Sequence, residues 1–528
     1  MSLARNTLVQ AALTLGSRVL GFARDLALAN RFGQGPLMDA FATALMAPNL
    51  FRRLFAEGAF AQAFVPVYGR VRTEDGEAAA ADTASQSLSF LLFVVAAFVI
   101  VVQLLMPLLM PWLLSAYRDK PDVLRLATIA TQLAMPYLAC MAVASLLSGV
   151  LNTAGRFALS AAVPALLNVC TLVPLVLIEE RERALLATSA AVAVAGLLQA
   201  GLLWWGVQRL GVRLRIGWPQ LSAVVRRVVV LAVPGAVAGG AMQINSLVSQ
   251  VLTGSDAGAR SVLYNADRLY QLPLGLVGVA IGLALVPRLT RSFVSGDEAG
   301  ANATLDDGVA LAMAFTLPAA AALFVMPYFV IDATVTRGAF THGDAARTAD
   351  VLRHFAWGIP AFVLAKVFTP PYFARQDMRR PMHFAMISVA VNVVLGASLY
   401  FGLDRLGMDG VVGLAVATSL AAWVNVLLLS GTLRREGVYR LQGAVAKRLL
   451  RMGAATALMA ALLWACAANY ERLSQLLWRK EVAVLVVTVA GLLTYTIAVL
   501  AFRAVTRAEL RAALRREPGG GGGGSFEP

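Results

Sequence analysis

Long apolar runs separated by short polar stretches follow one another along the whole chain of 528 residues. Each run holds roughly 18 to 30 residues, enough at about 1.5 Å of helical rise per residue to cross a hydrocarbon core of about 30 Å. The runs are continuous rather than alternating, which excludes the strands of an outer-membrane β-barrel. The pattern predicts an all-α polytopic membrane protein with about 14 transmembrane helices. We expect them near residues 5–30, 37–67, 85–114, 122–152, 157–178, 185–208, 222–252, 257–287, 306–331, 348–371, 382–402, 410–433, 448–468 and 482–503.

The polar stretches between the runs, such as 67–84, 288–308 and 333–350, are too short to fold a soluble domain with its own core. Composition agrees, since 59% of the residues are hydrophobic and 14% are charged. The sequence contains no GxxxxGK[ST], GxSxG or HExxH motif, and its three histidines have no metal-ligand spacing. We therefore expect neither an enzyme nor a cofactor, and we assign no metal site.

An even number of helices places both termini on the same side of the membrane. If that side is the cytoplasm, the inner segments hold about 25 of the 45 Lys and Arg residues and the outer loops about 13. This distribution predicts cytoplasmic termini. The net charge of +15 lies largely in short loops beside the spans, such as 209–227 and 434–451, which indicates contact with membrane lipids rather than nucleic acid.

Several ionisable residues fall well inside the predicted helices. Arg18 lies about 20 Å from the inner end of its helix, and Arg52 and Arg268 lie about 22 Å and about 15 Å from the outer ends of theirs. Each arginine at a helix centre costs about 2.5 to 3.5 kcal/mol to insert, so these side chains must face a bundle interior or a water-filled cavity. The whole set is Arg18, Arg24, Asp25, Asp39, Arg52, Arg53, Glu57, Asp267, Arg268 and Lys366.

Some of these charges can neutralise one another. Arg53 and Glu57 are four residues apart on a helix, and Arg18 and Asp25 share a helix face. Such pairing still leaves a small cationic surplus. Because a guanidinium group stays protonated when buried and makes two-point contacts with phosphate oxygens, the surplus predicts a phosphorylated or otherwise anionic ligand.

Four stretches of the sequence resemble the MurJ (MviN) family of bacterial lipid II flippases. They are SRVLGFARDLALANRFG at 17–33, DAFATALMAPNLFRRLFAEGAFAQAFVPVY at 39–68, ADRLYQLPLGLVGVAIGLALVPRL at 266–289 and ARQDMRRP at 374–381. The resemblance implies the fold of the multidrug/oligosaccharidyl-lipid/polysaccharide exporter superfamily, with two six-helix lobes around a central cavity. It divides the chain into an N-lobe at 1–215, a C-lobe at 216–440, two further helices with a lipid-tail groove at 441–506, and a flexible cytoplasmic tail at 507–528.

The resemblance also implies a function and a site. Lipid II, the undecaprenyl-diphosphate-linked disaccharide-pentapeptide precursor of peptidoglycan, would move from the inner to the outer leaflet of the bacterial cytoplasmic membrane by alternating access. Arg18, Arg24, Arg52 and Arg268 would bind the diphosphate or headgroup. Supporting or gating roles would fall to Asp25, Asp39, Asn49, Arg53, Glu57 and Asp267.

Other interpretations stay open at this point. One alternative is an exporter of another polyprenyl-linked glycan or of a drug in the same superfamily. A membrane enzyme acting on the lipid-linked precursor would need clustered acids or histidines near one interface, and we find none. Some family members use sodium, but the run 382–402 has no acid and offers only Asn392 and two serines, so coupling to Na⁺ or to the membrane potential is not assigned. A monomer, alone or with the cell-wall synthesis machinery, is the simplest assembly.

Overall fold

The computed structural model describes residues 3–50, 59–375 and 377–504, and within these ranges its regular secondary structure is helical. Ten of the described helices are, by length and composition, apolar enough to cross a membrane. Apart from 37–67, which includes residues outside the described ranges, each predicted run lies on one helix or on consecutive helices separated by a short break. The prediction of an all-α polytopic membrane protein is confirmed.

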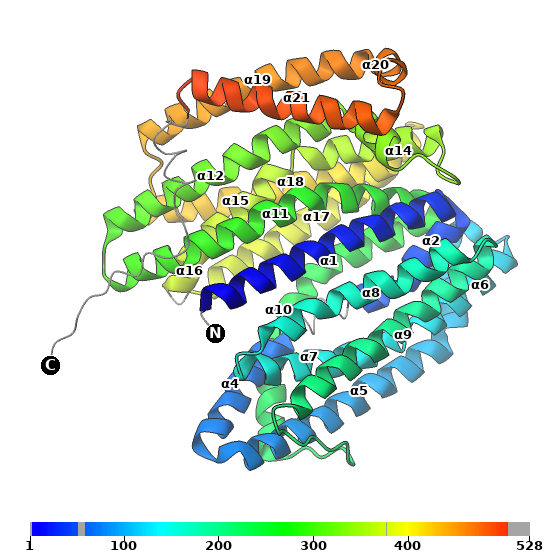
Figure 1. Ribbon diagram of the computed structural model, residues 1–528, viewed down its shortest axis with the longest axis vertical. Helices are drawn as coiled ribbons and strands as arrows, with labels where there is room; N and C mark the ends of the chain where they lie inside the picture. The colour runs from blue at the N-terminus through cyan, green and yellow to red at the C-terminus, as the bar shows by residue number, and fades with distance from the viewer. Residues whose placement is uncertain (1–2, 51–58, 376, 505–528) are drawn as a thin grey trace.

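A first bundle occupies the lower part of Figure 1. Its interior holds one apolar cluster around Phe64, Leu88 and Leu147 and another around Phe41 and Tyr137. The bundle consists of α1 (Leu3–Phe32), α2 (Pro36–Ala44), α4 (Ala59–Glu74), α5 (Gly76–Leu113), η1 (Ser115–Tyr117), α6 (Pro121–Ala134), α7 (Tyr137–Thr153), α8 (Phe157–Leu177) and α9 (Arg181–Gln208).

A second bundle lies beside the first. Apolar clusters around Leu352 and Phe355 and around Val363 and Leu429 fill its interior. Its elements are η2 (Thr253–Ser255), α11 (Ala259–Val294), α12 (Glu298–Val325), α13 (Pro327–Thr334), α14 (His342–Ala356), α15 (Ile359–Phe368), α16 (Pro370–Ala374), α17 (Arg379–Arg405) and α18 (Gly410–Arg435).

Two further parts complete the fold. Helix α10 (Ala223–Leu252) packs against α4 and α5 of the first bundle and also against α17 of the second. Helices α19 (Gly443–Ala468), α20 (Tyr470–Leu476) and α21 (Lys480–Ala501) form a hairpin at the top of Figure 1, where α19 lies on α12 and α21 contacts α13. The hairpin therefore extends the second bundle sideways.

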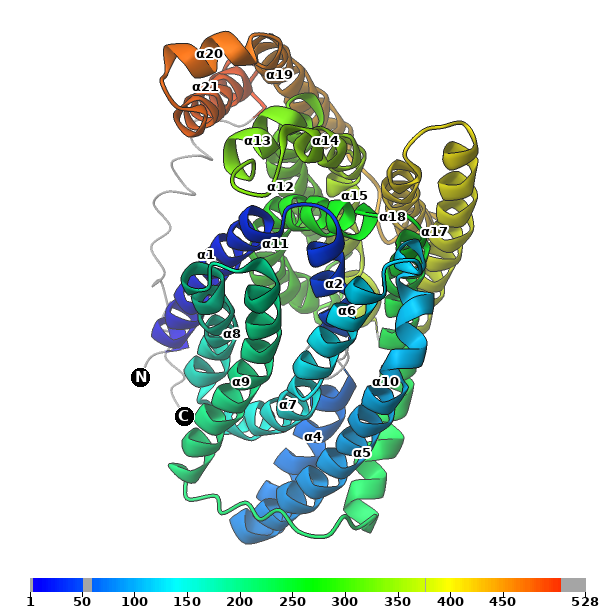
Figure 2. The same cartoon turned by 90° about the vertical axis from the view of Figure 1, so that its right-hand side faces the viewer.

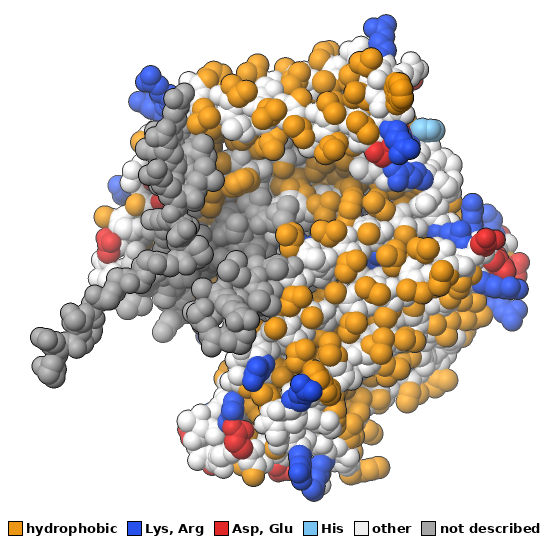
Figure 3. Space-filling model, viewed as in Figure 1, with side chains coloured by type: hydrophobic (Ala, Val, Ile, Leu, Met, Phe, Trp, Pro, Cys, Tyr) orange, Lys and Arg blue, Asp and Glu red, His pale blue; other side chains and the backbone are white. Residues whose placement is uncertain are grey.

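The long helices run between two ends of the molecule. The Asp39 end holds the α1–α2 connection (33–35), η1, η2 and the α13–α14 loop (335–341), and Figure 2 looks onto it. The terminal end holds the start of α1 and the end of α21. On the face drawn in Figure 3, charged side chains lie mainly at the rim and hydrophobic side chains cover the surface between. This distribution suits a membrane-spanning body.

The helices are longer than the apolar runs that predict them. Helix α4 continues to Glu74 and α5 begins at Gly76, so the polar stretch 67–84 is largely helical. Hydropathy marks only the part of a helix that crosses the bilayer, while caps such as Asp297, which accepts a hydrogen bond from Gly300 N, extend the helix into water. Elsewhere proline interrupts the backbone hydrogen bonds of a helix. The predicted run 122–152 breaks at Met135–Pro136 into α6 and α7.

The α13–α14 loop connects three parts of the molecule. Its Ala339 N–H donates to the Asn30 carbonyl of α1 at 2.8 Å. Its Thr336 carbonyl accepts from Lys480 Nζ of α21 at 2.7 Å, and its Arg337 pairs with Glu481. The loop thus joins the end of α1 to the C-terminal hairpin.

Candidate functional site

Helices α1 and α11 face each other along the seam between the bundles, and a single carboxylate joins arginines from both. On α1, Arg24 donates to Oδ1 of its neighbour Asp25 from Nε at 3.1 Å and from Nη2 at 2.7 Å. On α11, Arg268 Nε lies 3.7 Å from Asp25 Oδ2, and the Tyr264 hydroxyl donates to Oδ1 at 3.2 Å. We call these four residues the Asp25 cluster.

A hydrogen bond from the first bundle holds Arg24 in position. Asn168, in the middle of the apolar helix α8, accepts from Arg24 Nη1 at 2.9 Å and donates to the Ser17 carbonyl of α1 at 2.8 Å. A Cβ on Gly21 would lie 3.4 Å from Nδ2 of Asn168, so α1 and α8 approach closely here. Asn168 therefore sets both the position of α1 and the direction of the Arg24 guanidinium.

Arg268 has unused hydrogen-bonding capacity. Its guanidinium carbon lies 4.7 Å from the centre of the Tyr264 ring, a cation–π arrangement. Its Nε is closed to solvent, and among the described residues no acceptor lies within hydrogen-bonding distance of that atom. Because an arginine can donate five hydrogen bonds, an additional anion at this position would find donors that Asp25 leaves available.

Two more cations lie nearby. The Arg18 guanidinium lies over the backbone of Gly275 on α11, where a Cβ would approach Nη1 to 1.6 Å. Lys366 is an exposed residue on the largely buried helix α15, which packs against α11. Arg18, Arg24, Arg268 and Lys366 thus approach the seam, and the one carboxylate shared between two of them is Asp25. The local field favours an anion with several oxygens.

Asp39 performs a different task, since it holds the two bundles together at the Asp39 end. The residue is 1% exposed, and its Oδ2 accepts from Tyr117 Oη at 2.8 Å and from Gly258 N at 2.7 Å. Its Oδ1 accepts from both N and Oγ of Ser261 at 2.8 Å. Because Gly258 and Ser261 begin α11, the carboxylate of α2 caps a helix of the other bundle. Burial and the nearby Asp39 charge raise the pKa of Tyr117, which keeps its hydroxyl a donor.

Further contacts close the same end. Arg260, 2% exposed, donates to the Leu113 carbonyl of α5 at 2.6 Å and to the Gln250 carbonyl of α10 at 3.1 Å, and it also bonds Thr43. Gln34 Nε2 donates to the Asp344 carbonyl of α14 at 2.9 Å. The bundles are therefore joined at the Asp39 end by hydrogen bonds of the buried Asp39 and Arg260 and of the half-buried Gln34.

Known proteins identify the family. The family described as Lipid II flippase MurJ matches residues 28–499. The chain belongs to the MurJ family. A probable lipid II flippase MurJ of Rhizobium meliloti (strain 1021) is 37% identical over 469 residues, which are 88% of this chain and 86% of the relative. The lipid II flippase MurJ of Burkholderia cenocepacia is 31% identical over 89% of this chain and 91% of its own length.

Solved structures confirm the MurJ fold. A lipid II flippase MurJ in an inward closed conformation superposes with a TM-score of 0.77 at 22% identity, covering 96% of this chain and 100% of the other. An inward-facing multidrug transporter of the MATE family, in the MOP superfamily, gives a TM-score of 0.64 at 12% identity over 82% of this chain. Membership of a flippase family also confirms that the chain is a transporter rather than an enzyme, and that it is a multi-pass bacterial membrane protein.

Five of the candidate site residues lie in two separate places in the structure. Arg24, Asp25 and Arg268 lie together, and Arg18 approaches them from α1. Asp25 pairs with Arg24 and Arg268, whereas Arg18, the partner we considered from the sequence, lies over α11 instead. Asp39 lies in the separate inter-bundle contact.

The remaining candidates differ in what the structure says of them. Asp267 accepts from Gln271 on its own helix, and the Asn49 backbone N–H donates to the Leu45 carbonyl at 2.9 Å. Arg52, Arg53 and Glu57 lie outside the described residues. No group of three or more His, Cys, Asp or Glu able to hold a metal ion occurs in the part of the chain that is described.

Sequence reasoning missed two residues of this candidate site and of the inter-bundle contact beside it. Asn168 was detectable as a lone carboxamide in the apolar run 157–178, but it is neutral and so escaped a search for charges. Arg260 lies near the start of a predicted span, where an arginine is usually solvated, yet it is buried. Its burial depends on α2, α5 and α10, which local sequence does not reveal.

Proposed function

We propose that this member of the MurJ family transfers lipid II from the inner to the outer leaflet of the cytoplasmic membrane by alternating access of its two bundles. The observation that carries the proposal is the Asp25 cluster, in which one carboxylate holds arginines of both bundles. The relatives named as lipid II flippases supply the substrate. Its diphosphate has the multiple oxygens that Arg18, Arg24, Arg52 and Arg268 bind best.

Substrate capture begins at the seam. Diphosphate oxygens compete with Asp25 for Arg24 and Arg268, and Arg18 and Lys366 add positive charge. Releasing Asp25 from Arg268 weakens a direct link between α1 and α11. Binding of the anion therefore loosens the contact between the bundles at the level of the Asp25 cluster.

The Asp39 end faces the outside in this proposal, and both termini face the cytoplasm. The distribution of Lys and Arg over the loops supports this orientation. The polar contacts of Asp39 and Arg260 keep the outer side shut, so the described conformation receives substrate from the cytoplasmic side. Opening of the Asp39 end then releases the headgroup outward, while the polyprenyl tail stays in lipid.

We propose that residues 1–215 and 216–440 act as the two lobes and that 441–506 guide the tail. Support for a tail site is the apolar surface that the hairpin offers, with Leu485, Leu492 and Ile497 each more than 60% exposed on α21. On the neighbouring α12, Phe315 is 57% exposed. A saturable contact with a polyprenyl chain requires such continuous apolar surface.

The membrane potential is a sufficient energy source for the transfer of an anion outward. Each negative charge moved outward across an inside-negative potential gains about 2.3 kcal/mol per 100 mV. If this coupling is right, an inside-negative potassium-diffusion potential, set up by valinomycin in potassium-loaded proteoliposomes, accelerates export, and equal potassium concentrations on the two sides slow it. Equal rates with and without the potential would rule the coupling out.

The decisive experiment is sided transport in proteoliposomes. Purified protein, lipid II and a membrane-impermeant probe of external lipid II give the transfer rate. Arg268→Ala should lower this rate about tenfold, because the variant loses one charge-assisted contact with the diphosphate. The control is Arg70→Ala, which removes an exposed arginine paired with Glu74 at the end of α4. Wild-type transfer by Arg268→Ala would contradict the site.

A cellular measurement tests the function independently of the site. On depletion of the protein, lipid II accessible to an outside-only probe should disappear while total lipid II rises. Accessible lipid II together with reduced polymer would instead place the protein after translocation. That result would favour an enzyme or scaffold role.

A further inference from the structure

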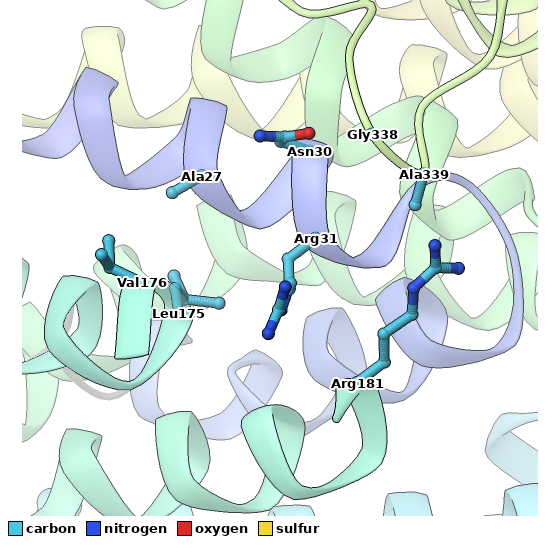
Figure 4. Close-up of a pocket in the computed structure, with 8 residues that line it drawn as sticks. All are labelled: Ala27, Asn30, Arg31, Leu175, Val176, Arg181, Gly338 and Ala339. Carbon is cyan, nitrogen blue, oxygen red and sulfur yellow. The ribbon is translucent and has the colours of Figure 1, made fainter. Parts of the chain in front are cut away.

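A cavity of about 370 Å³ opens at the Asp39 end, where α1 ends (Figure 4). Its walls come from Ala27, Asn30 and Arg31 of α1, from the end of α8, from Arg181 at the start of α9, and from residues 338–339 of the α13–α14 loop. Both bundles thus contribute to it. The volume lies within the range of about 300 to 1,000 Å³ that is usual for small-molecule sites.

Arg31 carries uncompensated charge beside this cavity. Its Nε and Nη2 are closed to solvent, and neither has a hydrogen-bond partner among the described residues. Its side chain points from α1 toward α8 and α9, and that of Arg181 rises from α9 toward the 338–339 loop. Arg31 is half-buried, and two guanidinium nitrogens closed to solvent without an acceptor are unfavourable, so the cavity is suited to an anion that supplies one.

The position of Arg31 on α1 relates the cavity to the Asp25 cluster. Arg31 follows Arg24 by seven residues, which is about 10 Å along a helix and returns to nearly the same face. Ala27, which lines the cavity, lies between them. One face of α1 therefore carries an arginine at the Asp25 cluster and a second arginine two turns closer to the Asp39 end.

The cavity also has an apolar side. Leu175 and Val176 of α8 line it, and Val176 is 68% exposed. An anion bound by Arg31 and Arg181 therefore lies next to surface that suits a hydrocarbon chain. This combination fits the phosphate end of a lipid better than a freely soluble phosphate.

From these observations we propose that Arg31 and Arg181 form a second, outer phosphate site that receives the diphosphate of the transported lipid after it leaves the Asp25 cluster. The inference rests on the proposed function. It adds a second binding site on the exit side of the transport path, and α1 contributes an arginine to this site as well as to the Asp25 cluster. The same chemistry would also recognise the phosphate of an ordinary anionic lipid, and the experiment separates the two sources.

A reporter thiol in the cavity tests the proposal. The full chain, with Cys140, Cys170 and Cys466 replaced by Ala and with Val176→Cys added, is reconstituted in phosphatidylcholine nanodiscs and labelled with a soluble methanethiosulfonate reagent. We expect undecaprenyl diphosphate to slow labelling. Arg31→Gln together with Arg181→Gln should raise the concentration needed for half-protection roughly a hundredfold, about tenfold for each lost charge-assisted contact.

Matched variants make the result specific. Arg183→Gln, two residues from Arg181 and 79% exposed in its pair with Glu180, should leave protection unchanged. Arg31→Lys keeps the positive charge and should retain most of the protection. This result would show that the double variant loses protection because charge is lost and not because the protein is misfolded. Unchanged protection in the double variant, with both proteins monodisperse, would overturn the site.

Two competitors identify the source of the phosphate. If phosphatidylglycerol or inorganic pyrophosphate protects the thiol at the same concentration as undecaprenyl diphosphate, the assignment to the transported lipid is overturned. Protection at least tenfold stronger by undecaprenyl diphosphate supports it. The transport assay in proteoliposomes distinguishes the two levels of inference. A protein that transports lipid II but shows no protection at Val176→Cys keeps the proposed function and loses the outer site.

Discussion

At the scale of single residues, the described part of the seam holds two carboxylates, Asp25 and Asp267, beside the four cations Arg18, Arg24, Arg268 and Lys366. Asp25 is shared by Arg24 and Arg268, while Arg18 and Lys366 extend the positive field. Full neutralisation would make a rigid structural ion-pair network, and full absence of acid would leave a repulsive cluster in a membrane protein. The observed balance stabilises the empty protein and still favours an incoming diphosphate.

Gly275→Ala tests the position of Arg18. The new Cβ would lie 1.6 Å from Nη1 of Arg18, so the guanidinium, the far end of a flexible side chain, must move away from α11. We expect binding of undecaprenyl diphosphate to weaken about tenfold, the loss of roughly one charge-assisted contact, with no loss of folded protein. Binding is measured by titration in nanodiscs. Gly16→Ala on α1, where nothing lies within 4 Å of the new Cβ, is the control and should bind normally.

Asp39→Asn tests the inter-bundle contact. Asp39 accepts four hydrogen bonds. The carboxamide of asparagine has one oxygen and one NH₂ group, so at least one of the four donors would face another donor. The closed Asp39 end should lose about 2 kcal/mol, a change of roughly thirtyfold in the ratio of closed to open molecules. A thiol at the fully buried Ala259, introduced as Ala259→Cys, should then react faster with a membrane-impermeant reagent.

The control for this experiment is Asp82→Asn, which removes an exposed acid that bonds only Gln86 in the described contacts of α5. Its labelling rate should equal that of the parent. An unchanged rate in Asp39→Asn would mean that the four hydrogen bonds do not hold the end shut.

The residues of this site differ in how visible they are in the sequence. Arg24, Asp25 and Arg268 are detectable in the sequence because a charged residue inside an apolar run is costly to insert into the membrane and therefore indicates a specific role. Their arrangement is not detectable, since Asp25 and Arg268 are far apart in sequence and the sharing of Asp25 depends on how α1 meets α11. The sequence search missed Asn168 because this side chain is uncharged, although it lies within a predicted span. It missed Arg260 because this charged residue lies at the end of a predicted span, where charges are common.

At the scale of elements, apolar runs predict where helices cross the membrane but not where helices end. The run 37–67 begins within a turn of α2, which starts at Pro36, yet α2 ends at Ala44. The run 306–331 breaks at Met326–Pro327 into α12 and α13. Helix caps and prolines decide these points, and hydropathy is insensitive to both.

Asn168→Ala tests how α8 holds α1. The substitution removes an acceptor for Arg24 and a donor for the Ser17 carbonyl, both inside the packed contact between the helices. We expect a loss of about 1 to 3 kcal/mol of stability, seen as a lower apparent Tm in detergent, together with slower lipid transfer. Ser160→Ala on the same helix, whose buried hydroxyl has no hydrogen-bond partner among the described residues, should leave both quantities unchanged. Equal Tm values for the two variants would refute the role of Asn168.

At the scale of the whole molecule, α10 is the element that most limits how the bundles can move. It packs on α4 and α5 and on α17, so a rocking motion must slide at least one of these contacts. Hydropathy placed α10 as an ordinary span. Its double packing follows from the three-dimensional arrangement of the bundles and has no counterpart in the local sequence pattern.

Cross-linking the Asp39 end tests whether it must open during transport. Gln34 of the α1–α2 connection bonds the Asp344 carbonyl and the Thr348 hydroxyl of α14, so Gln34→Cys with Thr348→Cys places two thiols on opposite bundles. A short bifunctional thiol reagent that is cleaved by reductant should stop lipid transfer, and reductant should restore it. Each single variant, treated identically, should transfer lipid at its untreated rate. Undiminished transfer by the linked protein would exclude alternating access at this end.

The α13–α14 loop has a practical consequence. Arg337 and Gly338 are exposed, while their neighbours bond α1 on one side and the C-terminal hairpin on the other. With the Asp39 end outward, a compound or antibody fragment that grips this loop would meet the transporter without entering the cell. It could immobilise α1 and the hairpin together, which makes the loop a target for inhibitors excluded by permeability or efflux.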